Sequence, residues 1–369
     1  MNDRQIAFVM CVNNNQYCEE CIKYINDLEV PEGYSIDVIS IEEAESMAQG
    51  YNAAMQASDA KYKVYMHQDV FIVNKRFIHD MLEIFANDKS IGMIGVMGTD
   101  MVPIHGEWYR AWTCGKVRGF SGKRDFLFDN YDGEGICKRV LAIDGMLMAT
   151  QYDIPWREEV FDGWDFYDIS QSFEMLLAGY KVVIPKQDRE WLYHDVGILG
   201  MKKYDYYKEL FIKEYKNQLV GMTIKTENHD IRKGRIKMAD EIADTVMQLA
   251  PKRCYAEIKK VLEELNSVYL NNTLCEVMAL ADIYLSEEKK DDSPSHSEWF
   301  YKKSWDEIYE SYNDVRLIML RIEYEAVADE RIELLRQKVK KGIITETAVI
   351  KIADRLFNEP DKVKKVILA

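Results

Sequence analysis

The sequence has few cysteines, and they do not form a recognisable framework. Seven are scattered over 369 residues. An odd number of widely spaced thiols argues against disulfides and is typical of a reducing compartment. Cys18-Glu19-Glu20-Cys21 is a lone CxxC, because no second pair follows it. We interpret it as two half-buried thiols on one helix face, with a metal or redox site as the alternative.

Long hydrophobic runs are also missing. No apolar stretch approaches the roughly 18 residues that a membrane-spanning helix needs. The segment Met1-Asn2-Asp3-Arg4 leads directly into a predicted strand, without the apolar core of a signal peptide. We therefore expect no transmembrane segment and a cytoplasmic protein.

Basic charge is scarce relative to acidic charge. The chain has 48 Lys and Arg against 63 Asp and Glu, a formal net charge of −15. Because a nucleic-acid backbone binds to a basic face, we expect no nucleic-acid partner. An anionic substrate would need local Lys or Arg residues, or a bound metal. The 47% of hydrophobic residues is enough for one large domain and a smaller one.

The first part of the chain alternates between strand and helix patterns. Continuous apolar runs predict buried strands, and apolar residues at helical spacing predict helices between them. This β-α-β-α-β order predicts an α/β domain built on a parallel sheet. The expected elements are strand 5–12, helix 17–28, strand 34–41, a helix in the latter half of 42–58, strand 61–66, helix 77–87 and a glycine-laced strand 91–98.

Periodicity fails between residues 99 and 138, where aromatic residues such as Trp112 crowd among glycines and charges. We predict an ordered functional loop, whose rings suit either sugar binding or plain packing. A strand over 140–149, broken by Asp144-Gly145, follows the loop. A helix beginning at Asp168 or Ser170 and ending at Gly179 comes next, and the strand 180–184 and the segment 191–197 close the domain.

From about residue 206 the pattern changes to helices with apolar residues every three or four positions, interrupted by a polar break over 286–297. We therefore predict two domains, an α/β domain over 1–205 and a helical C-terminal domain over 206–369. The helical domain is expected to form homo-oligomers, to bind the acceptor or to contact another enzyme.

Polar residues stand at the end of a buried strand in His67-Gln68-Asp69, which follows the apolar run Val64-Tyr65-Met66. Ligands of open α/β sheets bind at the carboxyl ends of strands. Side chains two positions apart on an extended segment point the same way. His67 and Asp69 are therefore predicted to face one metal ion or one phosphate group, while Gln68 faces elsewhere.

Taken in order, several motifs resemble the GT-A domain of glycosyltransferase family 2-like proteins. They are the Asn-rich end of the first strand, Gly50-Tyr51-Asn52-Ala53-Ala54, His67-Gln68-Asp69, Asp144-Gly145, and Phe161-Asp162-Gly163 through Gly179. The likeness covers residues 5–200 and is strongest to the subgroup with His-Gln-Asp in place of Asp-x-Asp. It implies a Rossmann-like three-layer sandwich. It also implies a metal-dependent, inverting glycosyltransferase of the hexosyltransferase type, acting in polysaccharide biosynthesis, with a nucleotide-sugar donor, expected to be a UDP-sugar, and a saccharide hydroxyl as acceptor.

The resemblance also assigns roles to residues. Asp69 would hold a divalent cation, and His67 would stand where a second Asp is usual, which favours Mn²⁺ over Mg²⁺ because Mg²⁺ prefers oxygen ligands. Asp168, eleven residues before Gly179, would be the general base, with Tyr167 replacing the first acid of the family's pair. Capping of the helix is the alternative for Asp168. His194 would be a further metal ligand, or a histidine packed beside aromatic neighbours.

The expected site residues are Asp168 for catalysis; Asn13, Glu42, Asn52, His67, Gln68 and Asp69 for the donor; Trp112, Asp144, Gly145, Asp162, Trp164 and Asp165 for the acceptor side, with Asp162 and Asp165 as competing bases; and Asp69, His194 and His67 for the metal.

Three other functions compete with this interpretation. A sugar nucleotidyltransferase would want a Gly-rich, basic loop after the first strand, and Asn13-Asn14-Asn15-Gln16 is not one. A zinc hydrolase built on His67, Asp69 and His194 lacks the HExxH pair. A catalytically inactive binding or scaffold protein would use the helical tail as its interaction surface.

Overall fold

The computed structural model describes residues 1–99, 102, 114–121, 124–131, 133–195 and 203–219, and after residue 255 it describes residues 256–258, 317–318, 320, 324, 329–342, 344, 346 and 349–350. The chain divides into two compact units. The first holds Met1–Gly119, Phe126–Asp195 and Met201–Glu227, and the second holds the other residues. All candidate site residues that the structure describes lie in the first unit.

A seven-stranded sheet forms the centre of the first unit. Its strand order is β2 (Ser35–Glu42), β1 (Asn2–Val12), β3 (Ala60–Met66), β11 (Leu147–Thr150), β5 (Ile91–Gly95), β12 (Lys181–Pro185) and β9 (Cys137–Val140). β1 pairs in parallel with both β2 and β3, and β12 pairs in parallel with β5. The predicted β-α-β-α-β opening is therefore confirmed. β11 enters antiparallel between β3 and β5.

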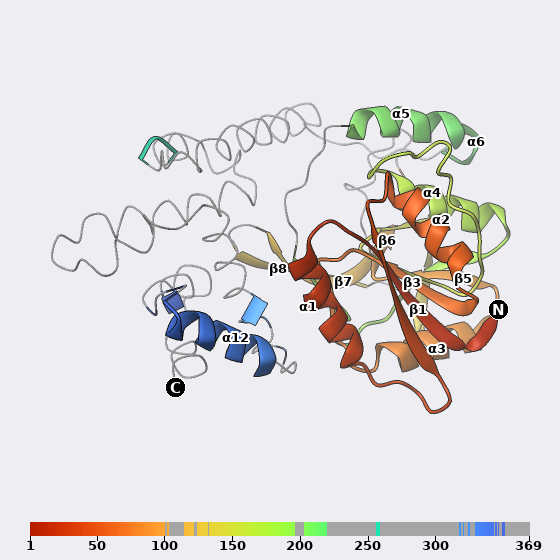
Figure 1. The fold of residues 1–369 in the computed structure, drawn as a ribbon. Coiled ribbons are helices and arrows are strands. Elements are labelled where there is room, and N and C mark those ends of the chain that lie inside the picture. Colours follow the sequence, from red (N-terminus) through yellow and green to blue (C-terminus); the bar gives the residue numbers. More distant parts are fainter. Residues whose placement is uncertain are drawn as a thin grey trace. The chain divides into compact units, whose positions relative to one another are not determined.

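Helices cover both faces of this sheet (Figure 1), with α1 (Asn15–Asn26) and α3 (Phe77–Asn87) on one side and α2 (Met47–Ala57) and α4 (Tyr167–Leu177) on the other. The alternation of side chains along β1 explains the arrangement. Ala7 and Val9 join the core cluster that contains residues of α2 and α4. Phe8 points the opposite way and contacts Phe77 of α3, with 6.3 Å between ring centroids. The result is the predicted three-layer α/β sandwich.

The CxxC pair lies on the buried side of α1. The Cys21 thiol donates to the carbonyl oxygen of Val70 over 3.2 Å, and the Cys18 sulfur lies 3.9 Å from that of Met10. Among the described residues no third ligand joins the pair, since their one metal-type cluster lies elsewhere. The two thiols are therefore core residues.

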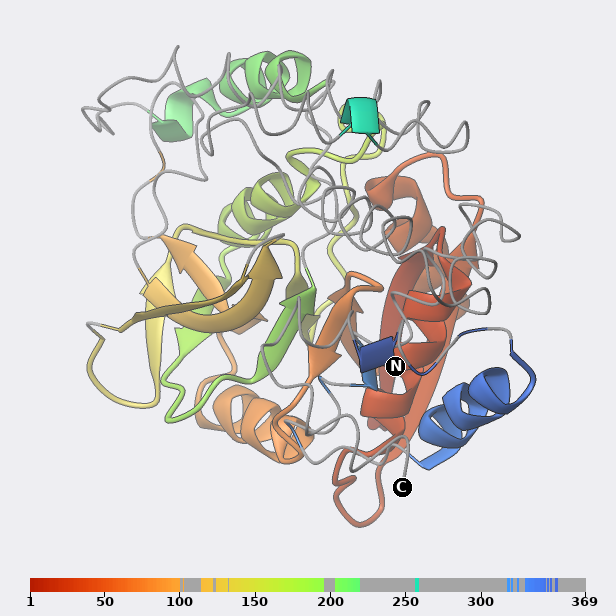
Figure 2. The same ribbon diagram turned by 90° about the vertical axis from the view of Figure 1, so that its left-hand side faces the viewer.

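A second sheet occupies much of the region that was expected to be a loop (Figure 2, gold and yellow strands). Its order is β10 (Ala142–Ile143), β6 (Met97–Thr99), β7 (Cys114–Ser121), β13 (Leu192–Asp195) and β4 (Val70–Ile72), and β8 (Arg124–Asn130) pairs with β7. The loop prediction for residues 99–138 is wrong at β7, β8 and the start of β9. These strands lack a clear two-residue alternation, so their pairing with distant segments decides their conformation.

Two short helices, α5 (Tyr204–Glu214) and α6 (Lys216–Leu219), follow β13. Phe211 of α5 packs against Phe173 of α4, with ring centroids 5.3 Å apart, and Arg157 forms ion pairs with both Glu174 and Glu214. In the second unit, α12 (Asp329–Lys340) is followed by Gly342 at φ 68°, a left-handed conformation that glycine adopts at helix ends. The domain boundary at residue 205 stays a prediction.

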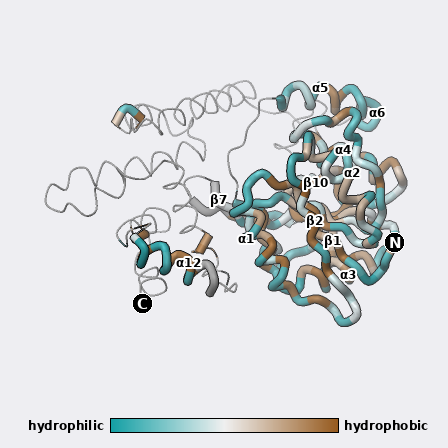
Figure 3. The backbone as a smooth tube through the Cα atoms, viewed as in Figure 1, coloured by the Kyte–Doolittle hydropathy of each residue, from teal (hydrophilic) through white to brown (hydrophobic). Residues whose placement is uncertain are grey.

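Hydrophobic residues concentrate in the central strands, whereas α12 is largely hydrophilic (Figure 3). Within the described part of the chain, none of the helices has the length and apolar character that crossing a membrane requires.

Candidate active site

The turn His67-Gln68-Asp69 carries the chain from one sheet to the other. β3 ends at Met66 in the first sheet, and β4 begins at Val70 in the second. The backbone N–H of His67 donates to the carbonyl oxygen of Met146 (3.2 Å), and that of Val70 donates to the carbonyl oxygen of His67 (3.3 Å). The polar triplet thus lies where the chain leaves the core, as its sequence predicts.

His194 reaches this turn from a distant part of the chain. β13 runs antiparallel to β4 with His194 opposite Val70, and the N–H of Asp195 donates to the carbonyl oxygen of Asp69 (2.9 Å). His194 Nε2 consequently lies 3.6 Å from Asp69 Oδ1, and His67 Nδ1 lies 4.0 Å from the same oxygen. We call these three residues the His-Asp-His cluster.

Burial and mutual charge set the protonation of the His-Asp-His cluster. Burial favours a raised pKa for Asp69, but the two histidines, His194 above all, outweigh it and lower the pKa of this carboxyl group. Burial lowers the pKa of His67. Burial also disfavours the charged form of His194, yet Asp69 reverses the effect and raises the pKa of this imidazole. At neutral pH the cluster therefore presents an ionised carboxylate and a neutral imidazole at His67.

The donor atoms of the cluster suit a divalent transition-type cation. One nitrogen from each imidazole and one oxygen of Asp69 all lie within 4.8 Å of one another. The side chains of His67, Asp69 and His194 are 30%, 24% and 13% exposed, so a ligand can reach them from solvent. Mixed imidazole and carboxylate ligands suit Mn²⁺ or Zn²⁺ better than Mg²⁺, which requires an oxygen environment.

Gln68 faces away from the His-Asp-His cluster and forms hydrogen bonds to the loop that follows β1. Its side-chain oxygen accepts from the backbone N–H groups of both Asn13 and Asn14, each over 3.0 Å, and its amide nitrogen donates to the side-chain oxygen of Asn13. Asn14 is the N-cap of α1, where its side chain accepts from the N–H of Tyr17. The end of β1 is therefore held against the end of β3, where a ligand of both strands would bind.

Asp168 lies in the first turn of α4 and is 4% exposed. Its Oδ2 accepts from the N–H of Gly145 (2.9 Å), and its Oδ1 accepts from the N–H of Ile169 (2.8 Å). Burial raises the pKa of Asp168 to about 8; the nearby Asp144 adds to this increase, while the two backbone donors oppose it. Each carboxylate oxygen has a second lone pair, so both hydrogen bonds leave the group able to accept a proton.

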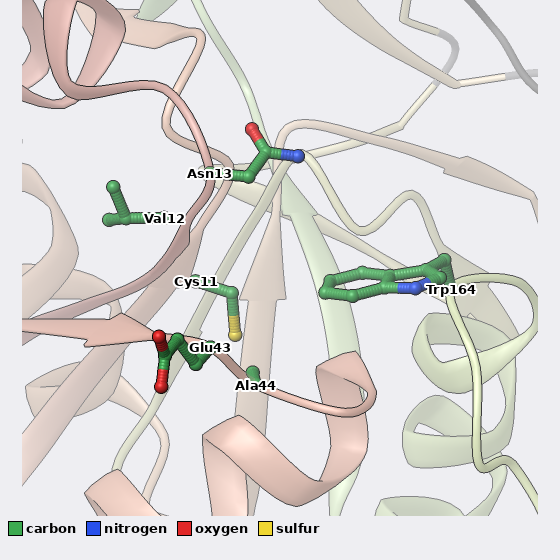
Figure 4. Close-up of a pocket in the computed structure, with 6 residues that line it drawn as sticks. All are labelled: Cys11, Val12, Asn13, Glu43, Ala44 and Trp164. Atoms are coloured by element: carbon green, nitrogen blue, oxygen red, sulfur yellow. The ribbon is translucent and has the colours of Figure 1, made fainter.

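A pocket of about 270 Å³ opens at the carboxyl ends of β1 and β2, lined by Cys11, Val12, Asn13, Glu43, Ala44 and Trp164. Figure 4 shows Trp164 across the pocket from Cys11 and Ala44, with an edge of its ring toward them and with Asn13 above the gap. Pockets for drug-sized ligands span roughly 300–1,000 Å³, so this one fits part of a ligand, such as one flat ring.

The model of the Glycosyltransferase like family matches residues 7–215, more than half of the chain. The chain belongs to this family. The three-layer sandwich of this glycosyltransferase-like protein is accordingly the GT-A fold that the motifs implied. Its membership of the His-Gln-Asp subgroup stays a prediction.

No curated protein matches this glycosyltransferase-like chain. Solved structures that match include a mannosyltransferase from Pyrobaculum calidifontis in complex with GDP-Man and Mn²⁺. That protein is 11% identical, and the match covers 79% of this chain and 89% of that one with a TM-score of 0.39.

Two predicted donor residues of this glycosyltransferase-like protein lie away from the pocket. Asn52 is buried, and its side-chain amide donates to the carbonyl oxygen of Trp156 and accepts from the N–H of Trp156, each over 2.9 Å. These two hydrogen bonds give Asn52 a structural role. Glu42 is the exposed last residue of β2 and does not line the pocket, whereas Glu43 does. The resemblance pointed to Glu42, but the next residue, Glu43, has a left-handed φ of 58° and is the one that lines the pocket.

The predicted acceptor-side residues separate into different roles. Asp162 is exposed and accepts a hydrogen bond from the hydroxyl group of Tyr207 (2.8 Å). This bond connects the loop before α4 to α5, where Tyr207 lies. Asp165 is half-buried, and burial raises its pKa to about 6. Trp164 lies at the pocket with Asn13, on the side predicted for the donor. Trp112 lies outside the described residues.

Asp144 and Gly145 form the turn between β10 and β11, and the turn is shaped by its neighbour Tyr167. A Cβ atom added at Gly145 would lie 2.2 Å from the Tyr167 hydroxyl oxygen and 2.7 Å from Cζ. Only glycine leaves room for this ring. The Asp-Gly pair in the sequence indicated a turn, but nothing in the sequence indicated that Tyr167 packs against it.

We predict that Gly145→Ala lowers the free energy of unfolding by about 1–3 kcal/mol, because the buried Tyr167 ring must shift to admit the methyl group. Urea denaturation measures the change. In a Tyr167→Phe background the nearest clashing atom is gone, so the same substitution should cost less. An equal cost in both backgrounds would contradict the packing described here.

Proposed function

We propose that this chain is a divalent cation-dependent glycosyltransferase that moves a sugar from a nucleotide-sugar donor to a saccharide hydroxyl group with inversion. The observation that carries the proposal is the His-Asp-His cluster. It stands at the end of β3 in a member of the glycosyltransferase-like family, and its donor atoms fit a Mn²⁺-type cation.

The donor would occupy the carboxyl ends of β1, β2 and β3. A cation held by His67, Asp69 and His194 would supply positive charge to a diphosphate in a chain whose net charge is −15. The pocket between Cys11 and Trp164 would take the nucleobase, with the indole offering a face for stacking. By its hydrogen bonds to Asn13, Gln68 would fix the position of the pocket relative to the His-Asp-His cluster.

Asp168 would act on the acceptor. As the acceptor oxygen forms its bond to the anomeric carbon, the bond from that carbon to the diphosphate oxygen breaks, and Asp168 takes the proton from the attacking hydroxyl group. Attack from the face opposite the leaving group inverts the anomeric configuration. The N–H groups of Gly145 and Ile169 fix the orientation of the carboxylate for this transfer.

A UDP-sugar is the donor that the resemblance implies, and the pocket residues by themselves do not choose between bases. The saccharide acceptor, a role in polysaccharide biosynthesis and the cytoplasmic location likewise stay predictions.

The cation site is tested by measuring donor hydrolysis and transfer with UDP- and GDP-sugars in the presence of Mn²⁺. We expect turnover that EDTA abolishes and Mn²⁺ restores. Asp69→Ala should lower turnover at least about 100-fold, because it removes the only carboxylate of the cluster. Asp37→Ala, which removes an exposed carboxylate on β2, is the matched control and should behave like wild type. Nucleotide binding without any turnover would instead favour the scaffold function.

The choice of base is tested with Asp168→Asn and Asp165→Asn together with pH profiles. A base must lose its proton before it can act, so a raised pKa moves the rising limb of turnover to higher pH. If Asp168 is the base, turnover should be half-maximal near pH 8 and level off above it. If Asp165 is the base, the half-maximal point should lie near pH 6.

We expect Asp168→Asn to lower kcat by about 100-fold or more while the Kd for donor changes little. A parallel loss of donor affinity and folding stability would identify Asp168 as a structural cap instead.

The nucleobase pocket is tested with Trp164→Ala. Loss of a stacking ring costs about 1–3 kcal/mol per base, so the Kd for UDP or GDP should rise roughly 5- to 150-fold in calorimetry. Tyr206→Ala removes another exposed aromatic side chain, located on α5 and absent from the pocket lining, and should leave the Kd unchanged. A Trp164→Ala protein that binds both nucleotides as wild type does would rule out stacking at this residue.

A further inference from the structure

The two ring nitrogens of His67 face different partners. Nδ1 lies 4.0 Å from Asp69 Oδ1, on the side of the His-Asp-His cluster. Nε2 lies 2.5 Å from the hydroxyl oxygen of Tyr167, within hydrogen-bond distance. Because one nitrogen is engaged by Tyr167, the orientation of the other toward Asp69 depends on where that hydroxyl group is held.

Tyr167 is confined on several sides. Its side chain is 5% exposed and belongs to the core cluster. It makes an edge contact with Tyr51 (6.0 Å between centroids) and a tilted contact with Trp156 (6.3 Å). Gly145 approaches the hydroxyl group so closely that even a Cβ atom would clash. The hydroxyl oxygen is therefore a fixed point for the His67 ring.

The backbone adds a further constraint, because Tyr167 is the first residue of α4 and follows Phe166, whose φ of 64° is left-handed. A non-glycine residue in this conformation is uncommon, and here the ring of Phe166 is anchored against Tyr204 and Phe211. The start of α4 thus determines both the direction of Tyr167 and the position of the adjacent Asp168.

Metal coordination gives this contact a chemical meaning. An imidazole that binds a cation through Nδ1 must carry its proton on Nε2, and an acceptor for that proton fixes the tautomer and the ring. The hydroxyl oxygen of Tyr167 lies within hydrogen-bond distance of Nε2 and has lone pairs that can accept from it. A neutral acceptor also adds no negative charge beside Asp168 and Asp144.

We propose that Tyr167 is a positioning residue for the cation site. Its hydroxyl oxygen accepts a hydrogen bond from His67 Nε2, and this bond holds His67 Nδ1 toward Asp69. Tyr167 contacts neither the cation nor the substrate and acts through His67. The proposal rests on the cation site of the proposed function, and it connects that site to the base, because neighbouring residues of one helical turn serve the two.

The test is the affinity for Mn²⁺ alone, measured by calorimetry and by the loss of the free Mn²⁺ signal in electron paramagnetic resonance. Tyr167→Phe keeps the ring and removes the hydroxyl group, and it should weaken Mn²⁺ binding about 10- to 100-fold. Tyr51→Phe is the matched control. It removes a buried hydroxyl group of the same aromatic cluster that bonds to the carbonyl oxygen of Met66, and it should bind Mn²⁺ within about twofold of wild type.

A double-mutant cycle separates positioning from general destabilisation. In a His67→Ala background Tyr167 has no imidazole to hold, so Tyr167→Phe should cause no further loss of Mn²⁺ affinity. An equal loss in both backgrounds would overturn the proposal. If the wild-type protein binds Mn²⁺ and the Tyr167→Phe protein binds it with the same affinity, this proposal alone is overturned. If the wild-type protein binds no Mn²⁺, the cation site of the proposed function is overturned as well.

Discussion

The backbone of one turn holds the two halves of the candidate site together. At Gly145-Met146, the carbonyl oxygen of Met146 accepts from the N–H of His67, and the N–H of Gly145 donates to Asp168. The turn can make both bonds because Gly145 has no side chain and the Tyr167 ring fills that space. His67 and Asp168 are thus both held by backbone groups, whose positions the surrounding strands determine.

The arrangement of the sheets delivers the remaining groups to this turn. β11 inserts antiparallel between β3 and β5, which brings the turn beside the end of β3. β13 pairs with β4 in the second sheet and places His194 next to Asp69. Segments separated by more than a hundred residues therefore meet within a few ångströms. In that setting an ionised carboxylate raises the pKa of one imidazole, while burial keeps the other neutral.

The sequence predicted those parts of the molecule whose signals are local. Continuous apolar runs and helical spacing identified the β-α-β-α-β order, and the polar triplet after β3 identified His67 and Asp69 as neighbours. Contacts between distant segments were not predictable. The sequences of β7 and β8 lack a clear alternation, and their strands form by pairing with distant segments. The side chain of Asn52 is hydrogen-bonded to the backbone of Trp156. Glu43, which has a left-handed backbone, lines the pocket in place of Glu42. Only the motif resemblance, and no periodicity, directed attention to Asp168 and His194.

The most direct test is anomalous diffraction at the manganese absorption edge, using crystals of the chain grown with Mn²⁺ and UDP. We expect a single strong peak bounded by His67 Nδ1, an oxygen of Asp69 and His194 Nε2, with the diphosphate beside it, and no peak in Asp69→Ala crystals. An empty cluster in crystals that contain bound UDP, or manganese held only by carboxylates elsewhere, would contradict the account.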